Sequence, residues 1–433
     1  DHISIMRTVS KLLLSCVMLF TLLPDAVLHA SDRKTLFDSN WKFHLGIVAN
    51  AEQPEYNDSH WRVLDLPHDW SVEPLSFQKQ GITTGPFSRM SEGDIDTGQT
   101  VGGEGWYRKE LTLAGSDADK RIVLYFEGVY NQSELWINGK KANYNVYGYT
   151  SYRVDITPYL NAPGTPNVIA MKVVNAGRNS RWYAGSGIFR HVWLIKTNKL
   201  YLDKWDTFVN ASELQKKEAV IQFSTIVHNE GLQNQSGKIG IKIYSPAGNE
   251  VFSTSQDVIL SEGTPVATSF SLKKPELWSV DTPVLYTAEV SLSSDGKEYD
   301  KISVPFGIRT LSFSAEKGFL LNGKSMKLKG GCVHHDNGLL GAAAIDRAEE
   351  WKVELMKANG YNAVRCAHNQ VSEYFLDACD RLGMLVIHET FDQWQKAKRE
   401  QDYHQFFDEW SDWDLAASVR RDRNHPSIIM WSI

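Results

Sequence analysis

Cysteine is scarce in this chain, which has four Cys among 433 residues. No pair has the Cys-x-x-Cys spacing of a zinc or redox site, and removal of an N-terminal signal would leave Cys332, Cys366 and Cys379. This odd number argues against a disulfide framework. All three lie in segments that we predict as buried strand ends or a helix, where a free Cys behaves as a small apolar side chain.

An excess of positive charge is also missing. The 46 Lys and Arg residues are outnumbered by 52 Asp and Glu residues, which gives a formal net charge of -6. Nucleic-acid binding depends on basic patches, so we expect no nucleic-acid partner. No apolar run reaches the roughly 20 residues that a membrane-spanning helix requires, so we expect no membrane span.

One short apolar run does stand out near the start of the chain. Arg7 and Lys11 precede the apolar segment 12–23, and small residues suitable for cleavage follow it. This is the pattern of a secretory signal, so we predict that residues 1–30 are removed on export to the periplasm or the cell exterior. A lipoprotein signal with Cys16 as the acylated residue is less favoured, because few apolar residues precede it.

Helical periodicity is nearly absent from residues 31 to 307. Short alternating runs fill residues 31–199, and Asn138-Gly139 after an apolar run predicts a type I′ hairpin turn. We predict a jelly-roll β-sandwich there. Residues 200–307 alternate in the same way and predict an immunoglobulin-like β-sandwich that acts as a packing module.

Residues 308–433 show a different pattern, in which predicted strands alternate with predicted amphipathic helices. We predict strands at 326–329, 363–366, 384–387 and 428–431, separated by helices at 347–359, 372–382 and 410–421. The first of these helices should bury the face that carries Ala348, Trp351, Leu355 and Ala358. About four βα-type strands in this order predict a parallel sheet or barrel.

Polar side chains gather where the first three of these strands end. The strands lead into Gly330–Asp336, Arg365–Asn369 and His388–Trp394. Active sites of such barrels lie at the carboxyl ends of the strands. We therefore predict a site for a hydroxyl-rich ligand, with Trp394 stacked on a sugar ring, formed by His334, Asp336, Arg365, His368, Asn369, Glu389, Asp392 and Trp394.

Structural interpretations of the same residues stay open. Glu389 could serve only as the buried ion-pair partner of Arg365. His334, His335 and Asp336 could be proposed as metal ligands, but adjacent residues of an extended segment point to opposite sides. We predict no metal site from these residues.

The motifs resemble those of glycoside hydrolase family 2, which holds β-galactosidases, β-glucuronidases and β-mannosidases. The resemblance implies a sugar-binding-type β-sandwich, an immunoglobulin-like domain and a TIM (β/α)8 barrel in that order, with the first half of the barrel, about four strands, in this chain. It is carried by Leu66–Trp70, Gly105–Lys109, Trp182–Leu194, Arg365–Asn369 and Asn424–Ile433.

The resemblance to the β-galactosidases implies retaining hydrolysis of terminal β-galactosides of oligo- or polysaccharides by two carboxyl groups. In the family, the segment that resembles Asn424–Ile433 continues to Gly-Asn-Glu, whose Glu is the general acid/base, and the nucleophilic Glu follows later. We therefore expect a chain truncated within the barrel, with no catalytic residue of its own and no activity alone. A β-glucuronidase, a β-mannosidase and a non-catalytic carbohydrate-binding protein stay open as alternatives.

Residue roles also follow from the resemblance. His334 and His368 correspond to binders of sugar hydroxyls, and Arg365 to the arginine that orients the nucleophile. Glu389 and Asp392 correspond to carboxylates at the rim of the site.

Two positions depart from the family pattern. Gln370 stands where the family usually has proline, and Arg181 stands where some β-galactosidases have a sugar-binding Asp. No organic cofactor is implied. A divalent cation or sodium, and a homo-oligomeric full-length enzyme, are left open.

Overall fold

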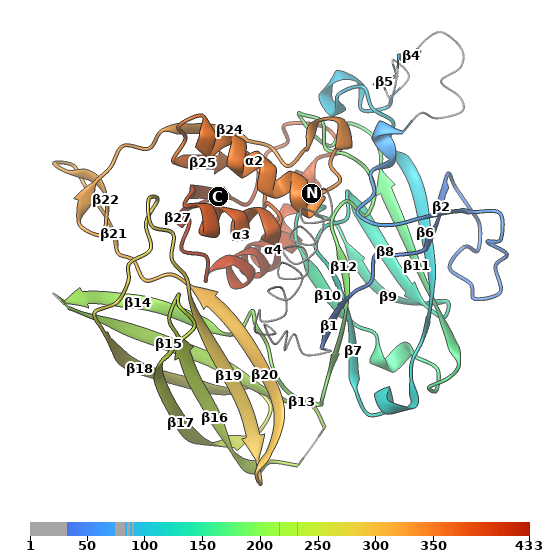
Figure 1. Cartoon of the computed structure of the whole chain (residues 1–433). Helices are drawn as coiled ribbons and strands as arrows, with labels where there is room; N and C mark the ends of the chain where they lie inside the picture. Colours follow the sequence, from blue (N-terminus) through green and yellow to red (C-terminus); the bar gives the residue numbers. More distant parts are fainter. Residues whose placement is uncertain (1–32, 74–82, 85–86, 89–90, 216, 232) are drawn as a thin grey trace, which may run out of the picture.

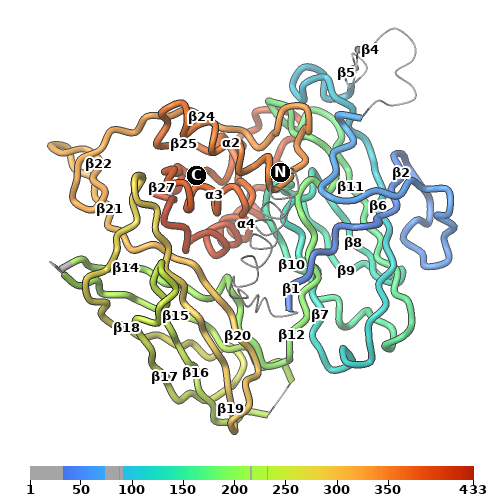
Figure 2. The backbone as a smooth tube through the Cα atoms, viewed as in Figure 1, coloured from blue at the N-terminus to red at the C-terminus, as the bar shows by residue number. Residues whose placement is uncertain are grey.

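The computed structural model describes residues 33–73, 83–84, 87–88, 91–215, 217–231 and 233–433. The predicted signal sequence 1–30, with Cys16, lies outside these residues. Two β-sandwiches and one mixed segment are visible (Figure 1; Figure 2). The first sandwich is blue to green, the second is green to yellow, and the strand-helix segment, orange to red, lies against both.

The first sandwich consists of two antiparallel sheets, as expected for a jelly roll. One sheet has the order β1-β12-β7-β10 and the other the order β3-β2-β6-β11-β8-β9. The strands are β1 (Lys34–Leu36), β2 (Trp41–Leu45), β3 (Arg62–Leu64), β6 (Gly103–Thr112), β7 (Arg121–Phe126), β8 (Gln132–Ile137), β9 (Lys140–Asn145), β10 (Tyr152–Asp155), β11 (Pro166–Asn175) and β12 (Val192–Thr197). A small pair, β4 (Thr83–Thr84) and β5 (Phe87–Ser88), stands apart.

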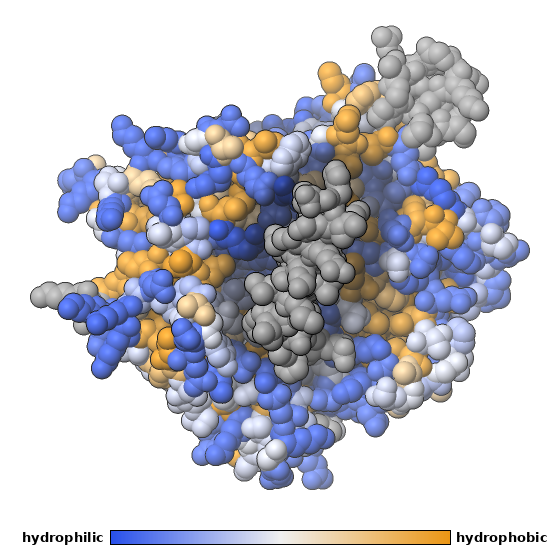
Figure 3. Space-filling model, viewed as in Figure 1, coloured by the Kyte–Doolittle hydropathy of each residue, from blue (hydrophilic) through white to orange (hydrophobic). Residues whose placement is uncertain are grey.

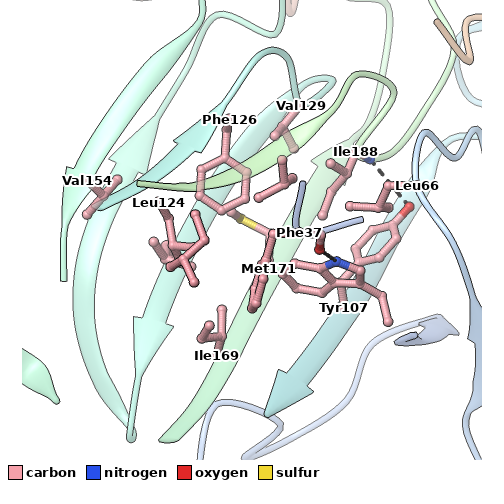
Figure 4. Packing of buried hydrophobic residues seen from close by; sticks show 14 of the residues in the cluster. Phe37, Leu66, Tyr107, Leu124, Phe126, Val129, Val154, Ile169, Met171 and Ile188 are labelled. Atoms are coloured by element: carbon pink, nitrogen blue, oxygen red, sulfur yellow. Dashed lines mark hydrogen bonds between the residues drawn. The ribbon is translucent and has the colours of Figure 1, made fainter. Parts of the chain in front are cut away.

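Apolar residues alternate with polar ones along these strands, and the apolar side chains form the core between the two sheets. Phe126 of β7 and Met171 of β11 pack together with Ile188, which lies just before β12 (Figure 4). The predicted hairpin is confirmed, because Asn138 and Gly139 between β8 and β9 both have positive φ, 52° and 76°.

The second sandwich follows directly and is immunoglobulin-like, as predicted. One sheet pairs β15 with β13, β14 and β18, and the other has the order β17-β16-β19-β20. Hydrophilic residues predominate on the outer surface of this sandwich in Figure 3. Its strands are β13 (Leu200–Leu202), β14 (Phe208–Gln215), β15 (Glu218–Asn229), β16 (Gln235–Tyr244), β17 (Glu250–Leu260), β18 (Thr264–Lys273), β19 (Tyr286–Ser294) and β20 (Lys297–Phe306).

The third part is the beginning of a barrel. Four parallel strands pair in chain order, β24-β25-β26-β27, with helices between them. A small antiparallel sheet precedes them, formed by β21 (Leu311–Ser314), β22 (Gly318–Leu321) and β23 (Lys324–Ser325). The barrel elements are β24 (Gly330–Val333), α2 (Asp346–Ala358), β25 (Ala363–Cys366), α3 (Glu373–Leu382), β26 (Leu385–Glu389), α4 (Phe407–Asp422) and β27 (Ile428–Ser432).

Short 3-10 helices complete the secondary structure of the described residues. They are η1 (Trp70–Val72), η3 (Asp94–Thr97), η4 (Gly115–Asp117), η5 (Thr157–Tyr159), η6 (Gly338–Leu340) and η7 (Tyr403–Gln405). In the described part of the chain, no helix combines the length and the apolar character needed to cross a membrane.

The first barrel strand is not where the sequence predicted it. Residues 326–329 are outside any strand, and β24 begins at Gly330. Gly330 passes so close to β25 that a Cβ atom there would lie 1.7 Å from the carbonyl oxygen of Ala363. Glycine is thus required by close backbone approach rather than by a turn. Cys332 of this edge strand is exposed, contrary to prediction, whereas Cys366 and Cys379 are buried.

The predicted buried face of α2 is also wrong. Trp351 and Leu355 are 54% and 43% exposed, whereas Glu349 and Val353 are buried. Glu349 accepts hydrogen bonds from Ser372 Oγ at 2.8 Å and from Asn337 Nδ2 at 2.6 Å. A charged residue can occupy the buried row because these donors replace water.

The first sandwich docks onto the barrel segment through buried polar and aromatic contacts. Arg190 donates from Nη2 to the Gln370 carbonyl at 2.7 Å, and the Tyr147 hydroxyl donates to the Thr390 carbonyl at 2.7 Å. Phe391 packs against the Tyr147 ring, with the ring centroids 5.5 Å apart. These contacts fix the loops after β25 and β26 relative to the sandwich, which positions the site described next.

Candidate active site at the barrel mouth

A polar pocket opens at the carboxyl ends of the barrel strands, where the sequence predicted a site. It encloses about 620 Å³. Its walls come from the ends of β25, β26 and β27, from the loop after β26 and from one loop of the first sandwich. The lining residues are Arg181, Arg365, His368, Glu389, Phe391, Asp392, Trp394, Lys396, Ala397, Lys398, Ser432 and Ile433.

Glu389, the last residue of β26, lies at the base of this pocket and is only 3% exposed. Arg365 of β25 donates from Nε to one carboxylate oxygen, and His368 Nδ1 lies 2.7 Å from the other. The hydrogen bond from Arg365 to Glu389 raises the pKa of the Arg365 guanidinium. Since an ionised carboxylate only accepts, His368 Nδ1 carries the proton and Nε2 remains available to a ligand. The ion pair suggested by the sequence exists, and the carboxylate also orients His368.

Asp392 is held by two cations from different domains. Arg181 of the first sandwich donates from Nε to Oδ2 at 2.8 Å and also contacts Oδ1, while Lys398 Nζ lies 3.0 Å from Oδ1. Burial favours the protonated acid, but the hydrogen bonds from Arg181 and Lys398 outweigh it and lower the pKa of Asp392. The carboxyl group is therefore ionised at neutral pH and cannot donate a proton to a leaving group.

Two further rings, those of Trp182 and His334, lie beside His368 but outside the pocket lining. The Trp182 ring lies 5.4 Å from the His334 ring and 5.7 Å from the His368 ring, measured between centroids. Burial is the main cause that lowers the pKa of His334, so its imidazole is neutral at pH 7. Trp394 is 50% exposed on the pocket wall, where a sugar ring can stack on it.

Three of the predicted site residues, His334, Asp336 and Asn369, lie outside the pocket lining. Asp336 is half-buried beyond β24. Asn369 is buried, and its Nδ2 has no hydrogen-bond partner among the residues described. His335 is buried and faces the sandwich, with Nε2 2.9 Å from the Ala184 carbonyl oxygen, so it points away from His334. His388 is fully buried and pairs with Asp422 at 3.0 Å.

Sequence reasoning missed four side chains at this mouth. Arg181 was noted only as a departure from the family pattern, and Trp182 only as part of a motif. Lys396 and Lys398 follow Trp394 at alternate positions, and both line the pocket. A cationic pair so soon after the predicted rim residues is the signal that could have identified them.

The described residues offer one group with the spacing of a metal site, and it lies elsewhere. Asp377 and Asp380 of α3 approach His425, which precedes β27. His425 Nδ1 is 2.6 Å from an Asp380 oxygen, and the other oxygen accepts from the Ser427 backbone N–H. Hydrogen bonds within the protein therefore already use Asp380 and His425 Nδ1.

Family comparisons agree with this architecture. Residues 35–198 match "Glycosyl hydrolases family 2, sugar binding domain", and residues 201–309 match "Glycosyl hydrolases family 2". Residues 314–433 match "Glycosyl hydrolases family 2, TIM barrel domain".

Individual relatives come from the same family. Beta-galactosidase BoGH2A of Bacteroides ovatus is 42% identical over 92% of this chain and 46% of its own length. A beta-glucuronidase of Formosa agariphila is 27% identical over 94% of this chain and 42% of its own length. The chain thus spans about half the length of these relatives or less.

Solved structures give the same result. A glycosyl hydrolase family 2 member from Bacteroides cellulosilyticus is 44% identical, with a TM-score of 0.89 over 92% of this chain and 51% of that chain. Bacteroides uniformis beta-glucuronidase 2, covalently bound to cyclophellitol-6-carboxylate aziridine, is 27% identical, with a TM-score of 0.78 over 92% and 46%. From its first sandwich to its barrel strands, the chain belongs to glycosyl hydrolases family 2.

Proposed function

We propose that the whole protein is a retaining β-glycosidase that removes terminal β-galactosides from oligo- or polysaccharides. The observation that carries this proposal is the pocket at the carboxyl ends of β25, β26 and β27, with its hydrogen-bonding groups and exposed Trp394. The choice of galactoside is supported by the similarity to a beta-galactosidase of Bacteroides ovatus. The reaction would use two carboxyl groups about 5–5.5 Å apart, one as nucleophile and one as acid/base.

The described residues would then bind and orient the sugar. His334 and His368 would contact hydroxyls, and Trp394 would stack on the ring. Arg365, held by Glu389, would orient the nucleophile. Asp336 and Asn369 would support the rim from outside the pocket lining.

We also propose that residues 1–433 alone do not catalyse hydrolysis. Glu389 and Asp392 are the carboxylates that line the pocket, and each is bound by two basic side chains. Neither is free to cycle between acid and base. Turnover of an aryl β-galactoside by the purified 433-residue chain would contradict this and would make the two residues the first to mutate.

A panel of nitrophenyl glycosides tests the proposed function in the whole protein. We expect the highest kcat/KM for the β-galactoside. A higher kcat/KM for the β-glucuronide or β-mannoside would show that this sugar, and not β-galactoside, is the substrate. Binding of galactose oligomers without turnover of any panel member would support a non-catalytic carbohydrate-binding protein.

Export is a further part of the proposal. The charged and apolar pattern of residues 1–30 is typical of a secretory signal. Intact-mass analysis of the secreted protein should place the mature N-terminus near Ser31. Retention of residues 1–30 would refute export by this signal.

A further inference from the structure

The charges at the pocket mouth are arranged in two layers. The side chains of Glu389 and Asp392 are 5% and 3% exposed, so both carboxylates lie below the surface. The basic side chains above them are far more accessible: Arg181 is 36% exposed and Lys398 is 43% exposed. A ligand that enters the pocket therefore meets positive charge first.

Positive charge is in excess at one corner of the mouth. Arg181, Lys396 and Lys398 line the pocket beside the single carboxylate of Asp392. Lys396 is exposed and forms no ion pair with any residue that the structure describes. Counted against Asp392, these side chains leave two positive charges in excess, and buried Asp402 also acts electrostatically on Arg181.

Donor groups at this corner also remain unused. A guanidinium has five N–H donors, and Arg181 directs only Nε and Nη2 to Asp392. The Lys398 ammonium has three donors, two of which contact the carboxylate and the carbonyl oxygen of Asp392. Guanidinium and ammonium groups side by side are suited to carboxylate and sulfate oxygens.

We propose that this cationic corner, defined as Arg181, Lys396 and Lys398, binds a negatively charged group on the carbohydrate substrate. The ligand class is a sulfated β-galactoside, because a galactoside has no carboxylate and a sulfate ester supplies the negative charge. The inference rests on the proposed glycosidase function and specifies its substrate. Asp392 anchors Arg181 and Lys398, while Lys396 supplies charge that no carboxylate among the described residues pairs with.

The test compares three substrates of the whole enzyme: a neutral nitrophenyl β-galactoside, its 6-sulfate and the nitrophenyl β-glucuronide. We expect kcat/KM for the 6-sulfate to exceed that for the neutral galactoside by roughly tenfold, the effect of one charge-assisted hydrogen bond. A preference for the β-glucuronide over both galactosides would overturn the sulfate assignment and replace the proposed galactoside substrate. Added salt should weaken the preference by screening.

Variants test whether Lys396 causes the preference for the acidic substrate. Lys396→Gln should lower kcat/KM for the preferred acidic substrate roughly tenfold more than for the neutral one, and Lys396→Arg should restore most of the difference. Lys238→Gln removes one exposed charge from β16 of the second sandwich and is the matched control. It should leave both values unchanged. Melting temperatures identify any variant that does not fold, and the salt dependence of the unmodified enzyme still tests the proposal.

The outcomes separate the two proposals. Activity on the neutral galactoside with no acidic preference and no salt dependence overturns the cationic corner alone. An equal loss for all three substrates in Lys396→Gln also overturns it. An enzyme that is inactive on every glycoside overturns the proposed function and this inference together.

Discussion

His191 Nε2 lies 2.9 Å from Asp346 Oδ1, which ties the first sandwich to the first helix of the barrel segment. His191 immediately precedes β12, and Asp346 is the first residue of α2. The other ring nitrogen, Nδ1, lies 2.5 Å from Asp38 Oδ2. A protonated imidazole can donate to both carboxylates at once, whereas a neutral one can donate to only one.

This pairing predicts a pH-dependent stability. Burial opposes the charge, but hydrogen bonds that His191 donates to Asp346 and Asp38 raise its pKa to about 10, above the usual 6.5. The stabilisation is fully present below about pH 6.5 and is lost as the pH rises through about 10. His191→Gln should therefore reduce the decline of the melting temperature between pH 7 and 10. Equal slopes for the variant and the unmodified protein would contradict this.

The two histidines proposed to bind sugar hydroxyls should matter for turnover more than for folding. In the whole enzyme, His334→Ala and His368→Ala should each lower kcat/KM by roughly tenfold to a hundredfold, because contacts to sugar hydroxyls that strengthen in the transition state are lost. Melting temperatures should change little. If unfolding accounts for the whole loss of activity, the histidines are structural and the assignment is wrong.

Ser372 should stabilise α3 from its N-cap position. Its hydroxyl accepts from the Phe375 N–H at 3.1 Å and donates to buried Glu349 at 2.8 Å. Ser372→Ala should lower the free energy of unfolding by about 1–2 kcal/mol, since it removes the cap and one donor to a buried carboxylate. Ser372→Thr keeps the hydroxyl and is the control. Equal losses in both variants, measured by urea unfolding, would exclude the hydroxyl as the cause.

Arg190 should be important for docking of the sandwich onto the barrel segment. It is 1% exposed and donates to the carbonyl oxygens of Gln370 at 2.7 Å and Tyr149 at 3.1 Å. Arg190→Met should cost about 3 kcal/mol in thermal unfolding, because buried carbonyl groups lose their donors. Arg347→Met, on the exposed face of α2, is the control and should cost far less. Similar costs would show that the buried contacts contribute little.

Elements with agreeing local signals could be predicted from the sequence. For α3, Ser372 caps the start, Gly383 adopts the left-handed conformation at the end, and Phe375 and Cys379 occupy one buried face. For α2, the apolar pattern predicted the wrong buried face. Glu349 is buried there because it accepts a hydrogen bond from Ser372, 23 residues away. Partners that are distant in sequence decide burial there, and periodicity does not encode them.

The same distinction applies to the site. Arg365, His368 and Glu389 could be placed together because parallel strands bring their carboxyl ends to one edge. The contribution of Arg181 could not be predicted, since it contacts Asp392 across 211 positions of sequence. That contact depends on how two domains dock, and side chains such as Arg190 that fix the docking have no recognisable local pattern.

The origin of Arg181 and Trp182 in the first sandwich has a consequence for how such proteins diversify. The pocket mouth is built jointly by two domains, so substrate choice can change through a loop of the domain that holds no barrel strand. Grafting a relative's version of residues 176–191 would alter the rim while every residue of the barrel stays the same. Selectivity and bond cleavage can thus evolve on separate parts of one chain.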